Sequence, residues 1–155
     1  MQFVQFVRRA TLAGLIAGLP LSVSAADYID NAKDYVDKAD WKAQSVVTVE
    51  LSEHHFAPEE IRFKAGQAYK VELKNVGEKD HYFTSPEFNR AVAWRKIMVN
   101  GQAEAKAPYF TAFEVLKKGG QLDLYFVPVK AGSYPVYCTI DDHRDKGMEG
   151  QLIIE

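Results

Sequence analysis

The sequence contains little cysteine, no long uninterrupted apolar run and no excess of positive charge. Cys138 is the only cysteine among 155 residues, so no disulfide can form within the chain. A largely apolar stretch at residues 11–23 is interrupted by two glycines and a proline and is too short for a membrane span. The sequence has 19 basic and 21 acidic residues. Nucleic-acid binding requires a basic patch, and this balance of charge gives no support to it.

The first 25 residues have the pattern of a secretory signal. Arg8 and Arg9 precede the apolar stretch, and Val23-Ser24-Ala25 supplies the small residues of a cleavage site. An uncleaved amphipathic anchor is the alternative. We expect an exported, periplasmic protein whose mature chain is not inserted in a membrane. Removal of residues 1–25 takes away two of the 19 basic residues and no acid, which leaves 21 acids and a formal charge of −4.

The remaining chain is predicted to be a helical extension at residues 26–44 followed by one domain at residues 45–155. Apolar residues between Asp27 and Asp40 recur at helical spacing, and Asp27 is placed to cap the helix. From Ser45 onwards the apolar period changes to two. Apolar and polar residues alternate at 45–51, 69–73, 122–126, 134–138 and 151–155. Many short alternating strands predict an all-β fold, an antiparallel Greek-key β-sandwich with a short N-terminal helix.

The segment from residue 84 to residue 120 has a mixed pattern and is locally basic. Residues 91–99 could form a strand or a helical turn, and residues 112–116 are predicted to form a strand. We interpret the segment as a crossing between the two sheets. It could shield a site or bind a partner, but a cover for an edge of the sandwich is the favoured interpretation.

Three possible metal donors stand at equal intervals near the C-terminus. Cys138, His143 and Met148 are each five residues apart, whereas neighbours on a helix face are three or four apart. Asp141-Asp142 and Gly147 also indicate a loop. The three groups could converge if this loop wraps around a small object.

Copper is the natural candidate for that object. Thiolate and thioether donors select copper, and two histidines with one cysteine and a weak axial methionine form an electron-transfer site. His81 can supply the second histidine. Zinc would accept cysteine and histidine, but it has little use for a thioether.

Each of these residues has a simpler explanation when taken alone. A single cysteine is often a small buried apolar residue, and a methionine often fills a core. A free thiol in an oxidising compartment is, however, a liability, and this favours a ligand role for Cys138. His54 and His55 would point to opposite faces of a strand, so an exposed turn is the favoured interpretation of that pair.

The spacing of these residues resembles that of the cupredoxins, small type 1 copper proteins, with a rusticyanin-like ligand loop. The pattern is Asn75-x₅-His81 followed by Tyr137-Cys138-x₄-His143-x₄-Met148-x-Gly150. The resemblance implies one copper ion with His81, Cys138 and His143 as equatorial ligands and Met148 as the axial one. It also implies that Asn75 ties the His81 loop to the Cys138 strand by hydrogen bonds.

The resemblance implies a one-electron carrier, not an enzyme, with the ring edge of His143 as the exit for the electron. Its partners would be redox proteins such as cytochromes or copper oxidoreductases, which a monomer would meet transiently. Asp141-Asp142 replaces the Pro-Gly that is frequent in the family, which points to a basic partner or a lowered reduction potential. The alternative is a protein for copper tolerance or delivery, with His54-His55 in an extra site. Too few histidines remain for a second catalytic metal centre.

Overall fold

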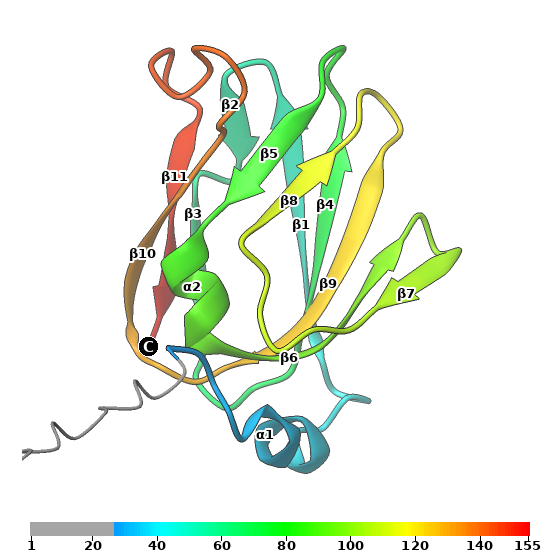
Figure 1. Ribbon diagram of the computed structural model, residues 1–155, viewed down its shortest axis with the longest axis vertical. Helices are drawn as coiled ribbons and strands as arrows, with labels where there is room; N and C mark the ends of the chain where they lie inside the picture. The colour runs from blue at the N-terminus through cyan, green and yellow to red at the C-terminus, as the bar shows by residue number, and fades with distance from the viewer. Residues whose placement is uncertain (1–26) are drawn as a thin grey trace, which may run out of the picture.

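The computed structural model describes residues 27–155, so the expected signal sequence lies outside the described residues. Two β-sheets pack face to face, with two short helices at their margins (Figure 1). The elements are α1 (Ala32–Lys38), β1 (Ser45–Ser52), β2 (His55–Ala57), β3 (Glu60–Phe63), β4 (Tyr69–Asn75), β5 (His81–Thr84), α2 (Pro86–Ala91), β6 (Val92–Val99), β7 (Ala103–Ala105), β8 (Ala112–Val115), β9 (Gln121–Pro128), β10 (Gly132–Tyr137) and β11 (Glu149–Ile154). Between residues 27 and 155, no helix has the length and apolar character needed to cross a membrane.

The predicted β-sandwich is confirmed, but its two sheets are mixed and not wholly antiparallel. The strand orders are β2-β1-β4-β9-β6-β7 and β3-β11-β10-β5-β8. Most neighbouring strands are antiparallel, whereas β1 pairs with β4, and β3 with β11, in parallel. The chain passes through β2 and β3 before it returns as β4, and this crossover gives β4 the direction of β1.

An aromatic cluster fills the space between the sheets. The ring of Phe126 contacts those of Phe63, Tyr69, Phe88 and Trp94, with centroids 5.3 to 6.3 Å apart. All five residues are buried. Large aromatic side chains contribute much of the apolar area that a core removes from water. The cluster therefore gives the sandwich a closely packed interior on which the loops at its ends are mounted.

Helix α1 packs against the sandwich through a small separate apolar cluster. Ile29, Ala93 and Val127 are its buried members, and α1 contributes partly buried residues around them. The predicted Asp27 cap is wrong: the helix begins after Asn31, whose side chain makes no capping hydrogen bond. Packing of its apolar face, and not a cap, therefore holds this seven-residue helix.

The segment between residues 84 and 120 does cross between the sheets. It leaves β5 in one sheet, runs through α2 into β6 and β7 of the other, and returns as β8. Strands β7 and β8 lie at the edges of their sheets, and residues 91–99 are mostly strand β6. The segment thus supplies two edge strands of the sandwich itself.

Candidate metal centre

The structure gathers His81, Cys138 and His143 into one buried group. One ligand atom from each lies within 4.8 Å of the others, and each residue is at most 1 % exposed. His81 opens β5 and Cys138 follows β10, and these two points lie at the same end of the sandwich (Figure 1). Among residues 27–155 this is the only group of three such donors. The structure thus brings together three of the four residues that the sequence analysis names as metal ligands.

The loop between β10 and β11 returns Met148 to the side of Cys138. The Cys138 N–H donates to the Met148 carbonyl at 3.0 Å, and the Met148 N–H donates to the His143 carbonyl at 2.9 Å. Asp141 and Gly147 have φ angles of +45° and +100°, which allow the chain to turn so tightly. Met148 is fully buried, as an axial donor over this group would have to be.

The donor atoms have the properties that a copper ion requires. Both ring nitrogens of His81 and Nε2 of His143 are buried without a hydrogen-bond partner in the described part of the chain. Such unsatisfied groups are costly, and a metal ion would satisfy one nitrogen of His81. In His143 the nitrogen that faces the Cys138 sulfur is Nδ1, so the unpaired Nε2 points elsewhere. The Cys138 Sγ lies 3.6 Å from His143 Nδ1 and accepts the Tyr82 N–H at 3.4 Å. One sulfur with two imidazoles fits copper.

The surroundings disfavour the protonated form of both histidines. Burial lowers the pKa of His81, and the neighbouring His143 lowers it further. Burial also lowers the pKa of His143, with smaller effects from His54 and Lys79. A neutral imidazole has a free lone pair, so these shifts favour the form that binds a metal.

Asn75 holds the loop that precedes His81. Its Nδ2 donates to the carbonyls of Lys79 at 2.7 Å and Val115 at 3.0 Å, and its Oδ1 accepts the Gly77 N–H at 2.9 Å. The expected tie to the Cys138 strand is therefore wrong. The hydrogen bond from Asn75 to the Val115 carbonyl instead reaches β8. Strand β5 lies between β10 and β8, and Val115 of β8 pairs with His81.

Asn75→Asp is expected to lower the free energy of unfolding of the metal-free protein by about 2 kcal/mol, because a carboxylate cannot donate to two buried carbonyls. Denaturation with urea would measure this. Asn100→Asp is the matched control, since Asn100 uses only its Oδ1, as an acceptor from the Gln121 N–H. We expect a change within about 0.5 kcal/mol for the control. Equal losses in the two variants would contradict the donor role.

His54 lies in the turn between β1 and β2, whereas His55 is the first residue of β2. His55 is exposed, and its Nδ1 lies 3.2 Å from Glu59 Oε1. His54 is partly buried, and its ring meets that of His143 edge-on, with centroids 5.0 Å apart. The expectation of an exposed turn is met by His55 alone. The ring of His143, the expected exit for the electron, is in contact with the His54 ring, and the residue is only 1 % exposed.

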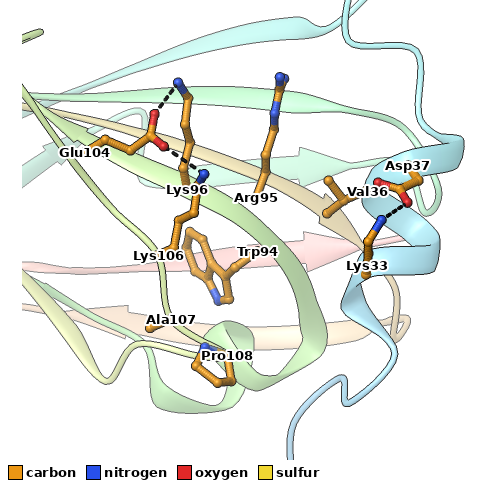
Figure 2. Close-up of a pocket in the computed structure, with 10 residues that line it drawn as sticks. All are labelled: Lys33, Val36, Asp37, Trp94, Arg95, Lys96, Glu104, Lys106, Ala107 and Pro108. Carbon is orange, nitrogen blue, oxygen red and sulfur yellow. Dashed lines mark hydrogen bonds and ion pairs between the residues drawn. The ribbon is translucent and has the colours of Figure 1, made fainter.

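A separate cleft of about 790 Å³ lies between α1 and the β6–β7 region (Figure 2). Its lining residues are Lys33, Val36, Asp37, Trp94, Arg95, Lys96, Glu104, Lys106, Ala107 and Pro108. Lys96 and Lys106 share the carboxylate of Glu104, at 2.8 and 2.9 Å. None of the four candidate metal donors lines this cleft, so it is not part of the metal centre.

Comparison with solved structures supports the fold. Auracyanin from Roseiflexus castenholzii aligns with a TM-score of 0.52 and 18 % identity, over 73 % of this chain and 98 % of that one. Auracyanin B aligns with a TM-score of 0.50 and 19 % identity, over 73 % and 89 %. Copper nitrite reductase from Nitrosomonas europaea aligns with a TM-score of 0.53 and 11 % identity, over 70 % of this chain and 48 % of the enzyme.

The fold therefore occurs both in small copper proteins and in parts of copper enzymes. No curated protein sequence matches the chain. The family model for a cupredoxin-like domain matches residues 30–154 of the sequence, which include all four candidate donors. The donors fit one copper ion as the cofactor. This chain belongs to the cupredoxin-like family.

Proposed function

We propose that this protein is a type 1 copper protein that carries single electrons between redox partners in the periplasm. The observation that carries the proposal is the buried group of His81, Cys138 and His143, whose imidazoles have unpaired nitrogens. In this proposal these residues are the equatorial ligands and Met148 is the axial ligand. The periplasmic location rests on the signal pattern of residues 1–25.

Bound among these donors, a copper ion would supply a one-electron couple. The chain holds its donors in place before any metal arrives, through Asn75 on one loop and through backbone hydrogen bonds between Cys138, His143 and Met148 on the other. Such constraints keep the ligands in one arrangement, so little energy is needed to reorganise them when the charge changes. The Tyr82 N–H donates to the sulfur at 3.4 Å and helps to hold it in position.

Burial of the donors favours a carrier over an enzyme. All four side chains are at most 1 % exposed, which leaves no surface on which a substrate could reach the metal. Catalysis by a metal ion usually requires an open coordination position or a second metal nearby. Residues 27–155 contain no second group of donors for such a metal. A protein of this kind passes electrons at a distance.

The burial of the four donors also argues against copper delivery or tolerance as the main role. A cargo protein needs a site that a partner can open, and under this alternative His54-His55 would form an extra site. These two histidines instead face different surroundings and form no donor group with other residues between 27 and 155. We propose that the partners are redox proteins with basic docking surfaces, because Asp141, Asp142 and Asp145 lie on the exposed ligand loop.

Titration of the metal-free mature protein with Cu(II) tests the proposal. We expect one copper per chain, an intense visible thiolate-to-copper band, a spin-resonance spectrum typical of a covalent copper–sulfur bond, and fast electron exchange. A colourless product would contradict the copper assignment. More than one copper per chain, with slow exchange, would instead support the cargo function.

A further inference from the structure

The turn that carries His54 is strained. Glu53 and His54 form a two-residue connection between β1 and β2, in which Ser52 pairs with His55. His54 has a φ of +61°, in the left-handed region that glycine and asparagine normally occupy in such turns. A side chain in this conformation costs about 1 kcal/mol, and it persists where the surroundings impose it. His54 is therefore held in place by its neighbours.

The holding contacts run to the loop that precedes His81. The Glu53 carboxylate accepts the N–H of Glu78 at 2.7 Å and that of Lys79 at 3.1 Å. Gly77 permits this approach, because a Cβ there would lie 2.8 Å from Glu53 Oε1. Hydrogen bonds from the backbone N–H of Glu53 itself, and then from those of Glu78 and Lys79, lower the pKa of the Glu53 carboxyl group. The β1–β2 turn is thus tied to one of the loops that carry a metal donor.

The tied turn places the His54 ring on His143. The two rings are perpendicular, with an interplanar angle of 89°. Nε2 of His54 is buried and, within the described residues, unpaired, as is Nε2 of His143. His54 is not a member of the group whose ligand atoms lie within 4.8 Å of one another, so it is a neighbour of that group and not a fourth strong donor. His54 is partly exposed, whereas His143 is buried.

We propose that His54 is a positioning residue that caps His143 and closes the metal site to small molecules. This inference rests on the proposed function, in which His143 is a copper ligand. It differs from the expectation drawn from the sequence, in which His143 itself presents a ring edge to the partner. It also gives a reason for a histidine at a left-handed position, because asparagine or glycine there would leave His143 uncovered.

The first test uses the metal-free protein and the rate at which iodoacetamide alkylates Cys138. We expect His54→Gly and His54→Asn to raise this rate by about tenfold or more, since removal of the ring opens a path to the donors. His55→Ala, at the first residue of β2 next to the turn, is the matched control and is expected to react at the wild-type rate. Wild-type rates in both His54 variants would overturn the proposal.

Stability separates a cap from a purely structural role. Glycine relieves the left-handed strain, so His54→Gly is expected to unfold at a urea concentration no lower than the wild type, although its thiol reacts faster. Free imidazole should slow the alkylation of His54→Gly by refilling the space. Faster alkylation that follows a parallel loss of stability, with no rescue by imidazole, would show that His54 only supports the fold.

The copper-loaded protein provides a second, independent measurement. Azide should perturb the visible spectrum of His54→Gly and leave that of the wild type unchanged. An equal response of both proteins to azide would overturn the closure of the site. If neither protein becomes coloured with copper, the proposed function fails, whereas the alkylation rates of the metal-free proteins still decide whether His54 is a cap.

Discussion

Cys138→Ser is expected to abolish the visible colour of the copper-loaded protein and to weaken copper binding by more than about a hundredfold. The colour would arise from charge transfer between the Cys138 sulfur and the metal, and a serine hydroxyl offers neither a soft donor nor a thiolate charge. The cysteine is the only one in the sequence, so no other residue can replace it. A visible spectrum and a competition titration with a copper chelator would measure the two effects.

Met148→Leu is the matched control for the Cys138 variant. Both residues are buried, and leucine preserves the volume of methionine, so this variant should fold with a loss below about 1.5 kcal/mol. Because the thiolate remains, we expect it to keep an intense visible band, shifted in energy by the loss of the axial sulfur. A coloured Cys138→Ser protein, or a colourless Met148→Leu protein that still binds copper, would show that the roles of the two sulfurs are wrongly assigned.

The donors could be predicted from the sequence because their chemistry is local and distinctive. A single cysteine at the end of an alternating strand, with a histidine and a methionine at intervals of five, allows few explanations. The sandwich could be predicted for a similar reason, since the period of two is visible in each strand separately. Burial alternates strictly along β4, as the sequence pattern requires.

The features that could not be predicted are those that depend on which distant segments of the chain become neighbours in the fold. The parallel pairing of β1 with β4 follows from a crossover through β2 and β3, and no periodicity reports such a connection. The bond from Asn75 to Val115 joins residues 40 positions apart. His54 was assigned to an exposed turn because strand geometry was assumed, whereas its positive φ directs the ring to His143. A left-handed histidine has no distinct sequence pattern.

Gly150→Ala is the variant for which we expect the largest loss of stability, about 2–4 kcal/mol in the free energy of unfolding of the metal-free protein. An added Cβ would lie 2.2 Å from the carbonyl oxygen of Glu59. This oxygen belongs to the backbone and accepts the Gln151 N–H at 2.7 Å, so it cannot rotate away. The methyl group would therefore force β11 away from Glu59, the residue that precedes β3. Strands β3 and β11 are paired in parallel, so this pairing would be disturbed.

Gly101→Ala separates this steric effect from the general cost of replacing glycine. Gly101 has a φ of +68° but open space around its Cα, so alanine there should cost only about 1 kcal/mol. Gly150 is also two residues beyond Met148, so a shift of β11 should move Met148, the proposed axial ligand, and change the visible spectrum of the copper-loaded protein. Urea denaturation and that spectrum check both effects. A Gly150→Ala protein as stable as Gly101→Ala, with an unaltered spectrum, would mean that the β3–β11 pair does not position the ligand loop.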